Sequence, residues 1–128
     1  MKYLLDTHAF LWFISGYHRL SQRAENVIKD RSNEIFFSAA SAWELCIKIR
    51  LGRLTIEGDI EAFIVHQLAE NRFRSLPIHI SHSVYTLHLP EIHKDPFDRM
   101  LIAQLHQLLN PLISADRIIK KYDISTIW

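Results

Sequence analysis

Short apolar runs alternate with helix-patterned segments along almost the whole chain, and this alternation restricts the fold more than any other feature. The first run, from Lys2 to Leu5, ends at Asp6 and leads directly into a segment with helical spacing. A second β-prone run, from Glu34 to Phe37, again leads into a helical pattern. Alternating strands and helices are typical of proteins in which helices cover a mainly parallel sheet. We therefore expect an α/β fold, a three-layer sandwich with a mainly parallel central sheet.

The expected elements follow from periodicity and from the residues that favour helix starts and stops. The helix after residue 38 is expected to end at Gly52, since glycine is favoured just past a helix C-terminus. We expect strands at 2–5, 34–37, 112–113 and 123–127, an extended piece at 75–80, and helices at 8–15, 21–30, 38–51, 58–71, 81–88, 96–109 and 115–121. The chain has three glycines, four prolines and no repeat, so we expect a single domain over residues 1–128.

The composition excludes several classes of protein. With 128 residues and 48% hydrophobic content, the chain is apolar enough to form a core and too apolar for disorder. No apolar run approaches the roughly 18 residues of a membrane span, and the N-terminal stretch lacks a signal-peptide cleavage site. We therefore expect no membrane segment and a cytoplasmic location. The single cysteine, Cys46, leaves neither a disulfide framework nor a thiolate metal site.

Four acidic residues stand where an α/β fold would bring them together. They are Asp6, Glu44, Asp98 and Asp116. The first and the last follow expected strands, and ligands of such sheets bind at the carboxyl ends of the strands. Four converging carboxylates cannot all stay ionised without a cation between them. Because oxygen ligands suit Mg²⁺ or Mn²⁺, the pattern predicts a divalent metal and, from there, phosphate chemistry.

Each of these acids also has a purely structural explanation. Asp6 can cap the following helix, and Glu44 can complete a capping box with Ser41. A helix that begins near residue 38 would instead place Glu44 on an apolar stripe, where a carboxylate without a partner is costly. Asp95 is the expected cap of the helix at 96–109, which leaves Asp98 to point toward the sheet.

Basic and histidine residues lie close to the acidic positions. The basic candidates for substrate contacts are Lys48, Arg50, Arg99 and Arg117. They form either solvated faces or contacts for phosphates leading into the site, and the net charge of +1 means that attraction to RNA must come from such a local patch. His8 and His93 flank acidic motifs. A histidine–carboxylate site for zinc or manganese is one explanation, and a surface or supporting position is the favoured one.

Four phrases carry these residues, in order along the chain. They are LLDTHAFLW, SAWELCIKIRLGRL, DPFDRMLIAQ and the turn Ser114-Ala115-Asp116. Their order, spacing and local wording resemble the PIN-domain family, and most closely the small ribonuclease toxins of VapC-type toxin–antitoxin pairs, over essentially the whole chain. The resemblance implies that the four acids bind Mg²⁺ or Mn²⁺. It also implies supporting hydroxyls from Thr7 and Ser114.

The resemblance further implies a metal-dependent endoribonuclease with RNA as substrate, a cognate antitoxin protein as partner, and a homodimer. The antitoxin is expected to lay a helix or tail over an apolar groove, for which residues 11–14 and 47–54 are the candidates. The non-catalytic alternative is an RNA- or protein-binding module that keeps the fold. A haloacid dehalogenase-like phosphatase is disfavoured because its Asp-x-Asp motif would need an acid at His8. A phospho-acceptor receiver domain is disfavoured because it would need paired acids before its phosphorylated aspartate.

Overall fold

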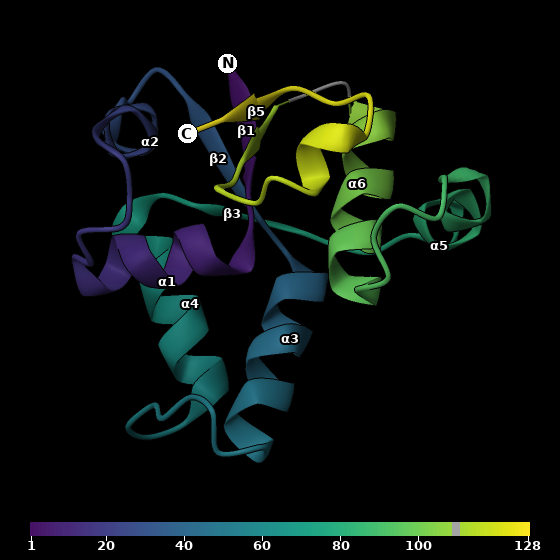
Figure 1. Cartoon of the computed structure of the whole chain (residues 1–128). Helices are drawn as coiled ribbons and strands as arrows, with labels where there is room; N and C mark the ends of the chain where they lie inside the picture. The colour runs from purple at the N-terminus through teal and green to yellow at the C-terminus, as the bar shows by residue number, and fades with distance from the viewer. Residues whose placement is uncertain (109–110) are drawn as a thin grey trace.

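The computed structural model describes residues 1–108 and 111–128, and it contains a five-stranded sheet with helices on both sides (Figure 1). The strands are β1 (Lys2–Leu5), β2 (Glu34–Ser38), β3 (Arg74–Leu76), β4 (Leu112–Ile113) and β5 (Thr126–Ile127). Their order is β3-β2-β1-β4-β5, and each neighbouring pair is parallel. The expected α/β sandwich with a parallel central sheet is confirmed.

Helices cover both faces of this sheet. They are α1 (Thr7–Ser15), α2 (Gln22–Lys29), α3 (Ala39–Arg50), α4 (Ile60–Asn71), α5 (Ile80–Tyr85) and α6 (Pro96–Leu108), with 3₁₀ turns η1 (Thr86–His88) and η2 (Ile119–Lys121). Figure 1 shows α1, α2 and α4 on one side of the sheet and α5 and α6 on the other. Among the described residues, no helix is both long and apolar enough to cross a membrane.

The two faces of the sheet support two separate cores. Tyr3 and Leu5 of β1 pack in one core with Phe10 of α1, whereas Leu4 packs in the other core with Ile102 of α6. Successive residues of a strand point to opposite faces, so a strand that is covered on both sides is apolar at every position. This explains why the strands appear in the sequence as continuous apolar runs.

Helix ends follow the local signals of the sequence. Asp6 caps α1, since its Oδ1 accepts a hydrogen bond of 2.7 Å from the amide of Ala9. Ser38 caps α3 by accepting from the amide of Ala40, so the helix begins where expected and Glu44 lies inside it. Gly52, with φ of 74°, adopts the left-handed conformation just past α3.

Some expected elements are shorter in the structure. The expected helix at 115–121 is reduced to η2, because Asp116 Oδ1 accepts the amide of Ile118 and forms a side-chain turn instead. The extended piece at 75–80 pairs with β2 only as far as Leu76, and the last strand is confined to two residues. The expected end of the helix at Leu109 lies outside the described residues.

The strand order places a binding position beside β1. The chain runs from β1 to β2 and β3 on one side, then crosses to β4 and β5 on the other. Such a reversal opens a crevice at the carboxyl ends of the strands. Asp6 and Ser114 follow the two adjacent strands β1 and β4, and the amide of Asp6 donates to the carbonyl of Ile113 over 3.2 Å. The crevice is therefore where the candidate site should lie.

Candidate metal site

A pocket of about 360 Å³ lies at the carboxyl ends of β1 and β4. The four predicted carboxylates all line it: Asp6, Glu44, Asp98 and Asp116. They come from four separate segments, namely the cap of α1, the middle of α3, the first turn of α6 and the turn after β4. The fold therefore brings together four acids that are distant in the sequence.

Asp6 is both a helix cap and a wall of the pocket. Burial raises the pKa of its carboxyl group, against the lowering effect of hydrogen bonds from Ser114 and from the amide of Ala9. Only 7% of the residue is exposed, so its charge cannot be stabilised by water. A neighbouring cation would favour the ionised form, and the cap and the ligand explanations of Asp6 are compatible.

Glu44 is held by groups from two helices. The hydroxyl of Thr7 donates a hydrogen bond of 2.6 Å to Glu44 Oε1. The ammonium of Lys48, one turn along α3, lies 3.5 Å from Glu44 Oε2 and 3.5 Å from His8 Nε2. The Thr7 hydroxyl therefore holds one oxygen of Glu44, and its supporting role at a metal stays a prediction.

Asp98 lies in the first turn of α6, but it is not the cap of that helix. The carboxylate of Asp95 accepts the amides of Phe97 at 2.8 Å and Asp98 at 3.3 Å, as the sequence predicted for a cap. Burial, followed by the charge of Asp95, raises the pKa of Asp98 to about 7, with smaller contributions from Glu44 and Asp116 and an opposing one from His93. The surroundings of Asp98 thus disfavour the ionised form of its carboxyl group.

Asp116 lies on the turn after β4, next to Ser114. The amide of Asp116 donates to Ser114 Oγ over 3.0 Å, which ties the turn to a fully buried hydroxyl. Its Oδ2 lies 3.2 Å from Nε2 of His93, and the same nitrogen lies 2.9 Å from Asp98 Oδ2. His93 therefore joins the carboxylates of α6 and of the last turn.

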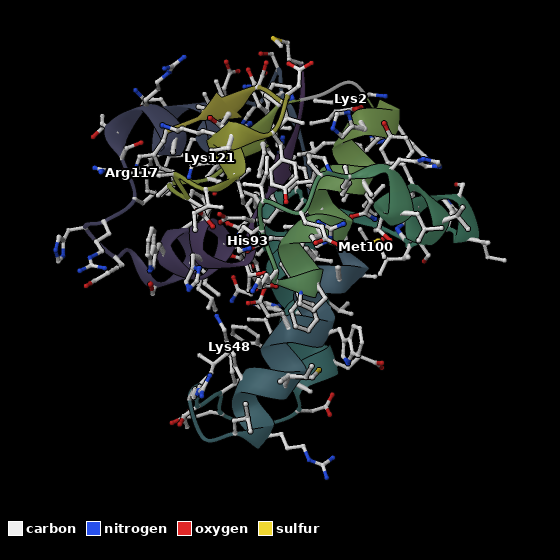
Figure 2. The ribbon with its side chains drawn as sticks, turned by 45° about the vertical axis from the view of Figure 1, so that its right-hand side comes forward. Lys2, Lys48, His93, Met100, Arg117 and Lys121 are labelled. Carbon is white, nitrogen blue, oxygen red and sulfur yellow. The ribbon has the colours of Figure 1, made fainter. Side chains whose placement is uncertain are left out.

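The four predicted basic residues are placed differently from one another. Lys48 reaches Glu44, and Figure 2 shows its side chain on the α3 side of the molecule, with His93 nearer the centre. Arg50 and Arg117 are exposed and are not among the described residues that line the pocket. The guanidinium of Arg99 donates instead to the carbonyls of a loop. These donors face backbone oxygens, and the substrate contact of Arg99 stays a prediction.

Sequence reasoning missed Arg19, Trp12 and Asp95 as residues of the pocket wall. Arg19 is exposed and follows the left-handed turn at Gly16 that ends α1. After this turn the chain places Arg19 at the wall of the acidic pocket. No acidic motif adjoins Arg19 in the sequence, so this position could not be predicted from a local pattern. Asp95 was explained by its role as a helix cap, so its position in the pocket wall was not predicted.

The donor set fits a hard divalent cation. The pocket presents carboxylate oxygens, and the only cysteine, Cys46, is exposed and is not part of its described lining. Two of the carboxylates, Asp6 and Asp98, have raised pKa values because burial opposes their charge. A cation between them would reverse that effect. Oxygen ligands of this kind suit Mg²⁺ or Mn²⁺.

Comparisons with known proteins agree with this geometry. A sequence model of the PIN domain matches residues 3–125. A search of curated proteins found no significant match.

Solved structures share the fold at low identity. The chain is similar to VapBC2 from Rickettsia felis bound to a DNA fragment from their promoter, with a TM-score of 0.71, 16% identity and coverage of 100% of this chain and 99% of that one. It is similar to FitAB bound to an IR36 DNA fragment, with a TM-score of 0.65, 15% identity and coverage of 98% and 93%. FitAcB from Neisseria gonorrhoeae gives a TM-score of 0.60, 15% identity and coverage of 98% and 96%. Because the family match spans nearly the whole chain, the protein belongs to the PIN domain family.

Proposed function

We propose that this protein is a metal-dependent endoribonuclease and the toxin of a type II toxin–antitoxin pair. The observation that carries the proposal is the convergence of four carboxylates, from four segments, in one pocket at the switch point of the sheet. PIN domains are generally nucleases that use divalent metals, which supports a hydrolytic role. The similar fold of VapBC2 and FitAB, both solved on DNA, supports the pairing with a second protein.

The proposed metal ligands are Asp6, Glu44, Asp98 and Asp116, holding one or two Mg²⁺ or Mn²⁺ ions. A bound ion would supply an activated water at neutral pH and would stabilise the charge that builds on the scissile phosphate. No side-chain nucleophile is then required. The proposal needs the protein to keep the carboxylates ionised and oriented.

Neighbouring side chains perform that orientation. The Thr7 hydroxyl fixes one oxygen of Glu44, and Lys48 partly neutralises the other. Ser114 joins Asp6 to the turn that carries Asp116. Arg19, exposed at the pocket wall, is the cation best placed to attract a phosphate of the RNA backbone.

An apolar groove of about 440 Å³ supports the antitoxin part of the proposal. Its apolar wall consists of Leu11, Trp12, Ile14, Leu54, Ile56 and Phe63. Of the two expected segments, residues 11–14 contribute strongly and residues 47–54 contribute only their last member. Trp12 lines both the groove and the acidic pocket. A partner helix laid in the groove would therefore end beside the carboxylates, where a basic side chain is attracted.

A homodimer also belongs to the proposal. Three apolar side chains on α5 and η1 are exposed, with Ile80 at 84%, Val84 at 51% and Leu87 at 82%. Exposed apolar surface of this kind favours contact with another protein surface. Sedimentation of the purified chain would measure whether two copies associate.

The decisive test is cleavage of a structured RNA pool by purified, antitoxin-free protein with Mg²⁺ or Mn²⁺. We expect cutting that stops in EDTA and in Asp98→Asn, because that substitution keeps the shape and removes the charge. Asp123→Asn is the matched control, since Asp123 is exposed and lies outside the described pocket wall. Wild-type rates in Asp98→Asn would refute the metal-site assignment. No cutting with either metal would favour the non-catalytic RNA- or protein-binding module.

A further inference from the structure

The loop between η1 and α6 places the imidazole of His93 against two carboxylates of the acidic pocket, Asp98 and Asp116, and hydrogen bonds hold the backbone of this loop. The guanidinium of Arg99 donates to the carbonyls of Thr86 and Pro90 at 2.9 Å, and to those of Leu89 and His93 at 3.4 Å. The amide of His93 donates to the hydroxyl of buried Tyr122 over 2.7 Å. The backbone that carries the imidazole is therefore fixed beside these two carboxylates.

Both nitrogens of the His93 ring have partners. Nε2 lies 2.9 Å from Asp98 Oδ2 and 3.2 Å from Asp116 Oδ2. Nδ1 accepts a hydrogen bond of 3.2 Å from the amide of Asp95. A backbone amide can only donate, so Nδ1 must present its lone pair and the ring proton must be on Nε2. The hydrogen-bond network thus assigns the tautomer.

This tautomer decides between two roles for His93. Its Nε2 and one oxygen from each of Asp98 and Asp116 lie within 4.8 Å of one another, a spacing that would suit a metal ion with a histidine ligand. A ligating histidine presents a lone pair to the metal and donates from its other nitrogen. Here the orientation is reversed, because the nitrogen that faces the carboxylates carries the proton.

We propose that His93 is a positioning residue that donates its Nε2 proton to Asp98 and Asp116 and orients these two carboxylates as oxygen ligands. His93 itself does not bind the ion, so the metal is held by oxygen alone. The proposal rests on the metal site of the proposed function. Its test measures metal binding and the tautomer of the His93 ring rather than RNA cleavage. It also explains why the loop is anchored by Arg99 and Tyr122, since a misplaced donor would misplace both carboxylates.

Calorimetric titration with Mg²⁺ and with Mn²⁺, at a single alkaline pH, tests the proposal. In His93→Ala we expect affinity for both ions to fall by a similar factor, about 10–100-fold, as for other residues that orient metal ligands. His93→Gln should recover most of the loss, because its amide N–H can donate as Nε2 does. His88→Gln is the matched control, since His88 is exposed and lies outside the described pocket wall.

The ratio of the two affinities separates positioning from ligation. Mg²⁺ is a hard ion that takes oxygen ligands, so an imidazole ligand would strengthen the binding of Mn²⁺ more than that of Mg²⁺. A ligand role therefore predicts that both His93 variants lose affinity for Mn²⁺ selectively, and this result would overturn the proposal. Unchanged affinities in His93→Ala would overturn it as well. A wild-type protein that bound neither ion would overturn both this proposal and the metal site. Metal binding without RNA cleavage would overturn only the ribonuclease assignment.

Nitrogen-detected NMR of the His93 ring gives an independent readout that a purely structural role would not move. We expect the Nε2–H tautomer in the metal-free protein and its retention when Mg²⁺ is added. A Nδ1–H tautomer in the Mg²⁺-bound protein would show a ligating nitrogen and would overturn the proposal.

Discussion

The acidic pocket and the apolar groove lie on the two sides of Trp12, which lines both, and they are built by opposite means. The pocket takes charged side chains from four distant segments and holds them near the carboxyl ends of the strands. The groove takes apolar side chains from α1, α4 and the segment that joins α3 to α4. One region concentrates negative charge, and the other concentrates apolar surface.

The difference shows what each region requires from outside the chain. In the pocket, burial opposes the charge of Asp6 and Asp98, so a cation bound there would balance that charge. In the groove, apolar surface is exposed to water, so a partner with an apolar face would lower the free energy by covering it. Substitutions in the pocket should therefore change chemistry, whereas substitutions in the groove should change association.

The largest expected effect comes from Asp6→Asn. Asparagine can still cap α1 by accepting the amide of Ala9, but it lacks the charge that the proposed metal site requires. We expect RNA cleavage to fall by about 100-fold or more. Circular dichroism and the melting temperature should show a folded protein at least as stable as the wild type, because burial opposes the Asp6 charge.

Normal RNA cleavage together with a lower melting temperature would contradict the assignment of the pocket to chemistry. If Asp6→Asn cleaved RNA normally but melted at a lower temperature, Asp6 would be only a helix cap. Asp59→Asn is the matched control, because Asp59 caps α4 in the same way and is not part of the described pocket wall. It should change neither cleavage nor metal binding.

A smaller effect is expected in the groove from Ile56→Asp. A charge on the apolar wall should weaken binding of the cognate antitoxin, taken as the small protein encoded beside this chain, by about 10–100-fold, or roughly 1.4–2.8 kcal/mol. Calorimetry or surface plasmon resonance would measure the affinity. Cleavage by the free protein should be unchanged, since Ile56 is not part of the described pocket wall.

Val65→Asp serves as the control for this prediction. Val65 lies on α4 with 60% exposure and is not part of the described groove wall. Equal losses of antitoxin affinity in Ile56→Asp and Val65→Asp would show that the partner does not occupy the groove. A loss confined to Ile56→Asp would separate the two regions as proposed.

The smallest effect is a pH-dependent change of stability in Asp98→Asn. In the metal-free protein the pKa of Asp98 is raised from 3.8 to about 7, so the unfolded chain releases the proton first as pH rises. The stability contributed by the protonated carboxyl is fully present below about pH 4 and is lost as pH rises through 7. In EDTA at alkaline pH, we therefore expect Asp98→Asn to be more stable than the wild type and to unfold at a higher Tm.

Thermal unfolding in EDTA, measured across this pH range, checks the sign of the stability difference between Asp98→Asn and the wild type. The advantage of Asp98→Asn should shrink as pH falls toward 4. Added Mg²⁺ should stabilise the wild type more than the variant, since only the wild type gains the bound ion. An Asp98→Asn protein less stable than the wild type in EDTA at every pH would contradict the prediction that the ionised Asp98 carboxylate destabilises the metal-free folded protein.

Much of the site could be predicted because local signals and chemistry agree. Asp95, followed by Pro96, satisfied the rules for a helix start, and the structure shows Asp95 as the cap. That left Asp98 without a capping role and predicted that it points toward the sheet; in the structure it lines the pocket at the carboxyl ends of the strands. The start of α3 at Ser38 similarly placed Glu44 inside a helix.

Other features depended on contacts that no local pattern records. Arg99 stands beside Asp98 in the sequence, which suggested a phosphate contact, yet its guanidinium holds four carbonyls of the preceding loop. The helix expected after Ala115 gave way to a side-chain turn at Asp116, because the aspartate accepts a nearby amide. In both cases a polar side chain forms hydrogen bonds with a partner that composition and spacing do not predict.

The sequence by itself determined the alternation of strands and helices, the helix caps and the identity of the four acids, because these depend on neighbours within a few residues. Only the tertiary structure decided the proton position on His93, the wall formed by Arg19, and the shared position of Trp12 between two cavities. Those features depend on the distances between segments far apart in the chain. Such distances are set by the packing of both faces of the sheet, and these hydrogen bonds depend on that packing to hold donor and acceptor within reach.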